Sequence, residues 1–540
     1  MPDERFQYDL AAAQWIPVRM RDGRARELGL QDTLVDAHEI AGLNVEFPTQ
    51  EPPLLRLLLA FCYRALQGPV DDQAWDSLWD APTLPESAIT AYLDRWRCRL
   101  DLFDPETPFF QSPLLQPAGQ GGIKPATRLI SHAPSANSIP LFTPMTDEMG
   151  LTLSPAEAAR WLIERHAWGT TSDKTGAKGN PRLKAGKDSP QVGYVAWIGF
   201  TAPIGRSLRE TLLLNLVPWS RSNLLHGGPD DLPAWERAPT GPAREERPPG
   251  GVCDLYTWQG RRILLFPEHR GDADVVASVL VCAGDDVQHD AVRSIDPHTG
   301  WCSKRERNGT LTYLPLRARP GQQVWRGLGA LLASGEDRRR AGVLSWLAAI
   351  EDRGVDHVSL LVTAMTFGNM SSTVEDLLSD SLDTPVAVLR SEDLAAYTVA
   401  SDAVELADKA AKALWKVADG PFLKLDPEKG HYKVPAGKID QARKAQKVIG
   451  EDLFVCLDAP FRHFLSELSS EQDLAAARKR WAAVVQKQAR AVAQRNVAQW
   501  SAAEVFTGTM AENWFRGSLA KALKQFCQVD SEDEGADGVC

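Results

Sequence analysis

The sequence pattern changes near residue 385, and this change is the strongest constraint on the fold. Beyond it, four stretches carry apolar side chains three, four or seven positions apart, the spacing that gathers them on one face of a helix. The first stretch contains Leu406 and Leu414 and stops at Gly420-Pro421, a pair that ends helices. Four amphipathic helices with short connections are typical of a bundle. The sequence therefore predicts a C-terminal four-helix bundle over residues 385–528.

The remaining three stretches of this region have their own boundary signals. We expect a kink at Pro460, because a proline inside a helix removes a backbone hydrogen bond. The motif Ser470-x-x-Asp473 is a suitable opening for the next helix. The predicted helical stretches cover, in chain order, residues 448–468, 470–485 and about 511–526.

The preceding part of the chain mixes helix and strand signals. Trp15–Val18 has the pattern of a short strand, and Asp22-Gly23 that of a turn. Residues 54–62 are apolar nearly all round and predict a buried helix. Several short β-like runs separated by turns lie between residues 252 and 325. We therefore expect an α+β fold, with a large mixed domain over residues 1–375 ahead of the bundle.

Length and charge agree with such a division. The chain has 540 residues, more than one hydrophobic core organises, so two or more domains are expected. Its net charge of −11 argues mildly against a protein that coats nucleic acid, but phosphate contact depends on where Lys and Arg cluster. Part of the acidity lies in the run 530–534, and we expect residues 529–540 to form a disordered acidic tail.

The sequence also predicts a cytoplasmic protein without a membrane segment. No run of eighteen apolar residues occurs, and the N-terminus lacks the basic start and apolar stretch of a signal peptide. The eight cysteines are scattered, with no C-x-x-C pair, which suits reduced thiols better than a disulfide framework or a zinc site.

A search for catalytic motifs finds no recognisable active site. The chain has no P-loop, no G-x-S-x-G elbow and no H-E-x-x-H helix. His289-Asp290 is the one candidate for a metal-dependent nuclease or phosphohydrolase. It lies in a stretch that we expect to be loop and strand, and a surface dipeptide is the preferred interpretation. We therefore expect no catalytic residue, no metal and no cofactor.

The most distinctive polar feature is a basic, glycine-rich loop. Residues 169–190 and 226–251 contain few large apolar side chains and predict long loops, which in compact domains are often functional. Glycine allows close approach of the backbone to a nucleic acid, and nearby cations can contact phosphates. A solvated basic loop on a purely structural scaffold is the alternative. The first loop combines the cations Lys174, Lys178, Arg182, Lys184 and Lys187 with Gly176, Gly179 and Gly186.

Short fragments distributed along the chain resemble, in order, a known family: the large subunit (CasA type) of the type I-E CRISPR surveillance complex Cascade. Each fragment is weak alone, but seven in the same order are much more specific. They are Trp15–Arg19, Thr107–Gln111, Leu208–Asn215, Pro233–Glu236, Leu255–Gln259, Asp296–Thr299 and Trp325.

The resemblance implies a DNA-binding subunit of a ribonucleoprotein. Such a subunit recognises the protospacer-adjacent motif in double-stranded target DNA and helps open the duplex for pairing with the crRNA. It then recruits the helicase–nuclease that degrades the target. Base pairing supplies most of the sequence specificity in such complexes, while protein recognises the short motif. The expected partners are therefore target DNA, the 5′ end of the crRNA with the other Cascade subunits, and the helicase–nuclease.

The resemblance also places the site residues. The motif-recognition loop falls on the basic loop, and the duplex-splitting wedge falls between residues 367 and 372, where Met370 or Ser371 replaces a glutamine. The minor-groove cation has no clean counterpart, and His289 or Arg293 is the nearest candidate. The implied DNA contacts are Gly176, Ala177, Lys178, Gly179, Asn180, Arg182, Lys184, Asn369, Met370, Ser371, His289 and Arg293. The implied contacts with crRNA and subunits are Leu141, Phe142 and Thr143.

Overall fold

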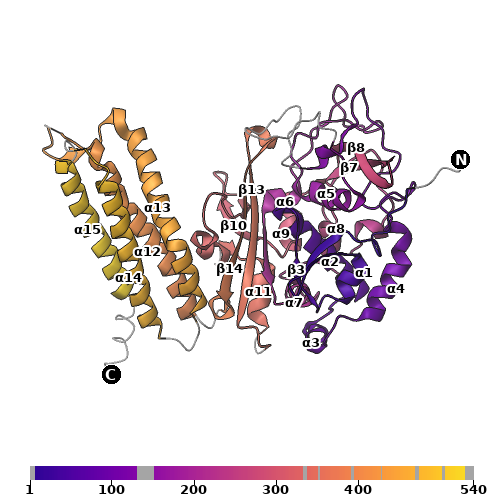
Figure 1. The fold of residues 1–540 in the computed structure, drawn as a ribbon, viewed down its shortest axis with the longest axis horizontal. Coiled ribbons are helices and arrows are strands. Elements are labelled where there is room, and N and C mark those ends of the chain that lie inside the picture. Colours follow the sequence, from indigo (N-terminus) through magenta and orange to yellow (C-terminus); the bar gives the residue numbers. More distant parts are fainter. Residues whose placement is uncertain are drawn as a thin grey trace. The chain divides into compact units, whose positions relative to one another are not determined.

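A computed structural model of the chain divides into two compact units, which are described separately (Figure 1). The first contains residues 1–322, 333–347 and 359–381, and the second contains 323–332, 348–358 and 382–540. The structure describes residues 6–130, 151–332, 337–350, 353–390, 394–426, 428–468, 473–501 and 505–528.

Helices and strands alternate irregularly before residue 390, and helices dominate after it, which confirms the predicted α+β fold with a helical C-terminal part. The α-helices are α1 (Leu30–Val35), α2 (Glu51–Ala65), α3 (Asp72–Asp80), α4 (Glu86–Trp96), α5 (Pro155–Trp168), α6 (Tyr194–Ile198), α7 (Leu208–Asn215), α8 (Val252–Tyr256), α9 (His289–Ile295), α10 (Leu328–Leu332), α11 (Gly342–Ala349), α12 (Leu394–Asp419), α13 (Ile439–Ser466), α14 (Leu474–Val497) and α15 (Val505–Gln528).

The strands form small sheets. The three-stranded sheets have the orders β2-β1-β3, β4-β8-β7, β14-β13-β5 and β11-β10-β12, and β6-β9 and β15-β16 are pairs. The strands are β1 (Ile16–Met20), β2 (Ala25–Leu28), β3 (Ile40–Leu43), β4 (Lys124–Pro125), β5 (Phe200–Ile204), β6 (Glu246–Arg247), β7 (Arg261–Arg270), β8 (Ala273–Ala283), β9 (Asp286–Val287), β10 (Gly300–Arg305), β11 (Leu311–Leu316), β12 (Arg338–Arg339), β13 (His357–Phe367), β14 (Val374–Pro385), β15 (Lys424–Leu425) and β16 (Tyr432–Lys433).

The predicted N-terminal hairpin and buried helix are both present. β1 pairs antiparallel with β2, and Gly23 takes a positive φ of 88° in the turn between them, a conformation that glycine adopts without strain. In α2, residues 52–63 are all buried. Arg56 lies among them, and its guanidinium donates to Asp296 Oδ2 at 2.7 Å and to the Tyr194 hydroxyl at 2.6 Å, which satisfies its buried charge.

The elements that carry the basic loop are α5 and the β7–β8 hairpin. Ser154 caps α5 by accepting from the Glu157 backbone N–H, and the Glu157 side chain accepts from the Ser154 N–H in return. β7 and β8 pair antiparallel, with Ile263 opposite Val281. Residues 169–190 leave the end of α5 without a helix or a strand, as predicted.

The second unit contains four long helices, α12 to α15, which run alongside one another (Figure 1). α12 packs against each of the other three, and buried Leu406, Leu414 and Trp481 lie on the inner faces. Asp473 caps α14 by accepting from the Ala476 N–H at 3.0 Å; it is the last residue of the predicted opening Ser470-x-x-Asp473, whose Ser470 lies outside the described residues. Pro460 lies inside α13. No helix in the part of the chain that the structure describes is both long and apolar enough to cross a membrane.

One expectation about local structure was wrong. His289-Asp290 was expected in a loop-and-strand stretch, but the two residues form the first turn of α9. The helix is only seven residues long, and Val292 and Ile295 are its only buried side chains. Two apolar positions three residues apart are too few to give a clear helical period in sequence.

Candidate nucleic-acid interface

The two ends of the basic loop meet at its base, where Arg261 of β7 joins them. The Arg261 Nη2 donates to the carbonyl oxygens of Thr170, at 2.8 Å, and Gln191, at 3.0 Å. The N–H of Gly193 also donates to Gly169 O at 2.7 Å. Residues 170 and 191 are therefore fixed beside each other, and the intervening segment projects as a closed loop.

Asp173, just inside this base, is surrounded by three arginines. Its carboxylate accepts from Arg165 and from Arg261 Nε at 2.9 Å, and Arg128 Nη2 lies 3.1 Å from it. Burial alone would raise the pKa of Asp173, but the three guanidinium groups hold it well below its usual range. A carboxylate that stays charged in a buried site fixes the geometry of the groups that pair with it.

The inner segment of the loop is packed against the body of the unit. Gly176 and Ala177 are buried, the Gly176 carbonyl accepts from Ala118 N–H at 2.8 Å, and the Lys178 N–H donates to Gln116 O at 2.8 Å. A Cβ on Gly176 would lie 2.4 Å from Gly186 O, so this glycine allows the loop to fold closely on itself. Gly176 and Ala177 thus shape the loop from inside.

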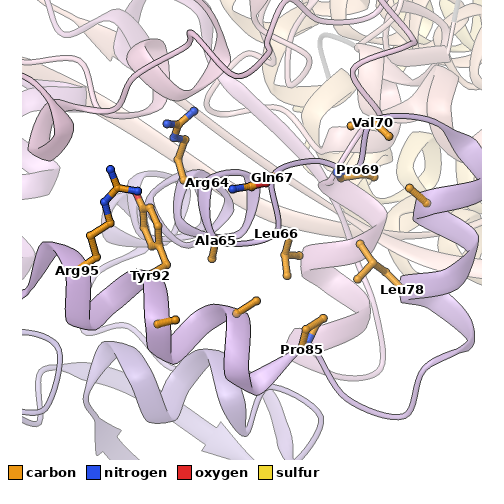
Figure 2. A pocket seen from close by; sticks show the side chains of 13 residues that line it. Arg64, Ala65, Leu66, Gln67, Pro69, Val70, Leu78, Pro85, Tyr92 and Arg95 are labelled. Carbon is orange, nitrogen blue, oxygen red and sulfur yellow. The ribbon is translucent and has the colours of Figure 1, made fainter.

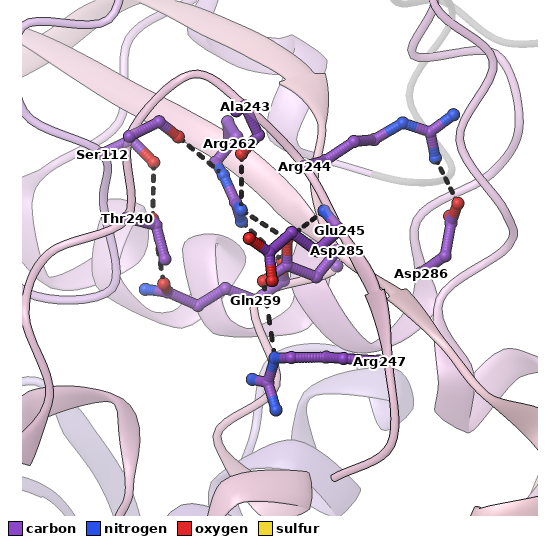
Figure 3. A network of polar contacts seen from close by, with 12 residues as sticks. Ser112, Thr240, Ala243, Arg244, Glu245, Arg247, Gln259, Arg262, Asp285 and Asp286 are labelled. Atoms are coloured by element: carbon purple, nitrogen blue, oxygen red, sulfur yellow. Dashed lines mark hydrogen bonds and ion pairs between the residues drawn. The ribbon is translucent and has the colours of Figure 1, made fainter. Parts of the chain in front are cut away.

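Asn180 also turns inward, whereas Arg182 stays exposed. Asn180 is buried, its amide nitrogen donates to Asp188 Oδ2 at 2.8 Å, and its side-chain oxygen accepts from the Arg182 N–H at 3.0 Å. Arg244 bridges the carboxylates of Asp188, at 2.7 Å, and Asp286, at 2.6 Å, and Arg182 lies 3.2 Å from Asp286. Figure 3 shows the pair between Arg244 and Asp286. The amide of Asn180 is therefore engaged within the loop.

The same region continues into a second polar network that supports residues 240–247. Arg262 of β7 donates to the carbonyl oxygens of Gly241 and Ala243 and to Asp285 at 2.5 Å (Figure 3). Thr240 Oγ1 lies 2.9 Å from Ser112 Oγ (Figure 3). This network holds the segment that carries Arg244, the residue bonded to the basic loop.

The outer side of the loop is cationic. The side chains of Lys174, Lys184 and Lys187 are exposed and make no ion pair with any residue that the structure describes. Lys178 is exposed too, 3.4 Å from the Gln116 side-chain oxygen. Gly179 is exposed, with a φ of +92°, and a Cβ there would meet only Pro242 Cγ, at 3.3 Å. Of the five residues 176–180, Lys178 and Gly179 are therefore the two that face outward.

The predicted wedge lies at the tip of a hairpin between β13 and β14. Asn369, Met370 and Ser371 form a single 3-10 turn, and Met370 is 78% exposed. Met370 and Ser371 have φ angles of 53° and 56°, the left-handed region that costs a residue with a side chain about 1–2 kcal/mol. A large exposed apolar side chain on a strained backbone needs support from its surroundings.

That support comes from the basic loop. The Thr171 hydroxyl donates to Met370 O at 2.7 Å, and the Thr171 N–H donates to Ser371 O at 3.1 Å. The structure therefore brings together the two regions that the sequence predicted separately.

His289 and Arg293 lie one turn apart on α9 and each stacks on an aromatic ring. The His289 ring lies 3.7 Å from the Trp197 ring with 9° between their planes, and the Arg293 guanidinium lies 3.4 Å from the Tyr313 ring centre. Burial against these neighbours lowers the pKa of His289. Neither side chain bonds to residues 169–190 or 368–372 among the described contacts.

The described residues outside the loop and the hairpin tip include a pocket but no metal site. No group of three or more His, Cys, Asp or Glu side chains suited to a metal ion occurs within the described ranges. A surface hollow of about 680 Å³ lies between α2, α3 and α4 and contains none of the predicted site residues (Figure 2). Of the polar side chains that line it, Arg64 and Tyr92 both bond to Glu236, and Gln67 and Arg95 are the others. The predicted contacts Leu141, Phe142 and Thr143 lie outside the described residues.

The residues that hold the site together were not predicted from the sequence. Thr171 and Asp173 lie in the basic loop, Arg244 lies in the second predicted loop and Arg261 lies in β7, and none belongs to a motif. One usable signal was present: Asp173 and Asp188 are acidic residues flanking an otherwise basic loop, and each proves to be an internal ion-pair partner.

Comparisons with known proteins point in one direction. The family model described as CRISPR-associated protein Cse1 matches residues 9–492. The crystal structure of Cse1 from Acidimicrobium ferrooxidans is 53% identical, covers 97% of this chain and 100% of its own, and superposes with a TM-score of 0.91. A chain of a structure described as a CRISPR RNA-guided surveillance complex shares the fold at 19% identity, with a TM-score of 0.67 over 97% of this chain and 99% of its own.

A curated relative, CasA/Cse1 of Thermus thermophilus, is 34% identical over 270 residues, which is 49% of this chain and 50% of the relative. The match thus spans half of that relative's length. The family model and the Acidimicrobium structure nevertheless extend over nearly all of this chain. The chain therefore belongs to the Cse1 family, which confirms the predicted relationship to the CasA-type large subunit of type I-E Cascade.

Proposed function

We propose that this chain is a subunit of a type I-E CRISPR RNA-guided surveillance complex and that it recognises the protospacer-adjacent motif in double-stranded DNA. It then helps open the duplex so that the crRNA can pair. The observation that carries this proposal is the direct bonding of an exposed basic loop to an exposed hairpin tip within one unit.

The outer side of the loop suits a nucleic-acid backbone. Exposed ammonium groups at Lys174, Lys178, Lys184 and Lys187 supply cations for phosphates, despite the net charge of −11. Gly179 has no side chain to keep the backbone away from a groove. Minor-groove recognition distinguishes few base pairs, which suits a short and tolerant motif.

The hairpin tip suits duplex opening. Apolar side chains inserted between base pairs unstack them, and Met370 is the apolar side chain exposed at this tip. We assign the wedge contact to Met370, with Asn369 and Ser371 as its neighbours. His289 and Arg293 remain candidates for a separate groove contact, since His289 is exposed and Arg293 is half-buried one turn further along α9.

The proposed partners follow from the family. They are target DNA, the 5′ end of the crRNA and other subunits of the complex through Leu141, Phe142 and Thr143, and the helicase–nuclease that acts after opening. In this division of labour the chain binds and positions DNA, while cleavage belongs to the recruited enzyme.

A double substitution tests motif recognition. The surveillance complex is assembled by co-expression with the neighbouring genes, and its preferred motif is selected from duplexes with a randomised flank. Lys178→Ala with Gly179→Asp removes a cation, adds an anion and strains the positive-φ position. We expect binding of the motif-bearing duplex to fall at least about tenfold, since one lost contact and one repulsion together exceed 1.4 kcal/mol.

The matched control makes the same types of change on an exposed turn elsewhere. Arg21→Ala with Gly23→Asp also removes a cation and strains a glycine, whose φ is +88°, and should leave DNA binding unchanged. Equal binding by the wild-type and Lys178/Gly179 complexes would overturn the loop assignment. Metal-stimulated DNA cleavage by the isolated chain, abolished by His289→Ala, would overturn the division of labour.

A further inference from the structure

Thr171 joins the basic loop to the wedge tip, and no other described hydrogen bond or ion pair connects residues 169–190 with residues 368–372. We propose that Thr171 is a positioning residue that couples motif binding to duplex opening by fixing the wedge tip to the base of the loop. This inference rests on the proposed function, because it assigns a mechanical role to a contact between its two parts.

On the basic loop, the residues beside Thr171 are held rigidly. Thr170 accepts from Arg261, Ser172 accepts from Arg128 through both its carbonyl and its hydroxyl, and Asp173 pairs with both arginines. Thr171 therefore lies between neighbours that are all bonded to buried or half-buried guanidinium groups. A displacement of Thr171 would disturb several charged hydrogen bonds at once, so it makes a firm anchor.

The wedge tip, on the other side of the contact, has few hydrogen bonds that could hold it in place by itself. Its remaining hydrogen bonds run within the tip, from Ser371 N–H to Gly368 O, from Gly368 N–H to Thr373 O, and from both the N–H and the hydroxyl of Ser372 to Asn369 O. Two consecutive non-glycine residues in the left-handed region favour relaxation once the restraint is lost. The Thr171 bonds to Met370 and Ser371 oppose that relaxation, and Met370 is the residue that carries the exposed thioether.

A wedge must resist the force of the base pairs that it separates. A tip free to relax would yield to the duplex, whereas a tip bonded to the motif loop transmits the binding energy of that loop to the site of opening. Loss of the Thr171 hydroxyl should therefore slow opening more than it weakens motif binding. A larger loss in the rate of opening than in motif affinity distinguishes a positioning role from a general effect on stability.

The test uses the assembled complex with Thr171→Val, which keeps the side-chain size and the backbone N–H but removes the donor to Met370. Thr171→Ser keeps the donor, and Thr83→Val provides the same change at an exposed threonine of the first unit. Binding is measured on the selected motif-bearing duplex. Opening is measured by the fluorescence of 2-aminopurine in the first base pairs beside the motif, and a second duplex has those pairs mismatched.

We expect Thr171→Val to slow opening of the paired duplex about fivefold, the effect of one lost hydrogen bond, with motif affinity within about twofold of wild type. The mismatched duplex should restore the wild-type rate, as should Thr171→Ser, and Thr83→Val should have no effect. Wild-type opening by Thr171→Val would overturn the inference, as would equal losses on both duplexes. A wild-type complex without motif preference would instead overturn the proposed function, and the inference with it.

Discussion

The basic loop and the hairpin tip are exposed regions of the same unit, but they are held in opposite ways. The loop is fixed from inside, by Asp173 among three arginines and by Arg244 between two carboxylates. Residues 368–372 of the hairpin tip have no ion pairs of this kind among the described contacts. The tip is a strained turn that depends on Thr171 for its contact with the rest of the site.

This difference separates residues that support the site from residues that can contact DNA. In the loop, Asn180 and Gly176 are directed inward, and the lysines with Gly179 face outward. In the tip, the exposed Met370 is itself the strained residue. Substitutions in the loop interior should therefore cost stability, whereas substitutions at the tip should cost function alone.

The largest expected effect is at the base of the loop. Asp173→Asn leaves three arginines around a neutral side chain, and removing one partner of a buried charge cluster costs about 3–5 kcal/mol. The free energy of unfolding, measured by urea with tryptophan fluorescence, should fall by that amount. Asp22→Asn, which removes an exposed pair with Arg24, should change it by less than about 1 kcal/mol. Equal values for the two variants would contradict an internally fixed loop.

The residues at the base of the loop should also make the free energy of unfolding depend on pH. Burial lowers the pKa of His166 to about 3, and its Nδ1 accepts from the Arg261 N–H. Its unfolded pKa is about 6.5, so the unfolded state binds more protons between these values and stability falls as the pH falls. We expect His166 to account for a loss of about 1 kcal/mol between about pH 6.5 and 5.5.

His166→Gln stays uncharged and keeps a donor and an acceptor, so it should remove that share of the pH dependence. Urea unfolding at the two pH values checks this. The buried His298, whose pKa is also lowered by burial, should keep its own share in the variant. An unchanged pH dependence in His166→Gln would show that the loop base does not depend on a neutral imidazole.

The smallest expected effect is at the tip. Met370→Gly relieves a left-handed backbone and should raise the free energy of unfolding by up to about 1 kcal/mol, while removing the apolar wedge. The assembled complex should then open duplexes more slowly although the chain is more stable. Leu114→Gly is the matched control, because Leu114 is 86% exposed with a φ of 58° and lies outside both regions. If Met370→Gly opened duplexes at the wild-type rate, Met370 would not be the wedge.

Much of the fold was predictable because its signals are local. Helical periodicity located the long C-terminal helices, and α14 begins directly after the predicted opening Ser470-x-x-Asp473. The short helix α9 was missed because two buried positions give no period. The family fragments proved to be mostly scaffold: Trp15, Trp235 and His298 are buried, and they identify the family by its core.

The sequence by itself determined the α+β fold, the helical C-terminal part and the basic character of residues 174–187, because periodicity and composition act over neighbouring residues. Only the tertiary structure decided which residues of that loop face outward and that Thr171 bonds to the wedge tip 199 residues away. Those outcomes depend on ion pairs and hydrogen bonds between distant segments. A charge in the sequence does not reveal whether its partner will be a carboxylate brought close by folding or a phosphate of bound DNA.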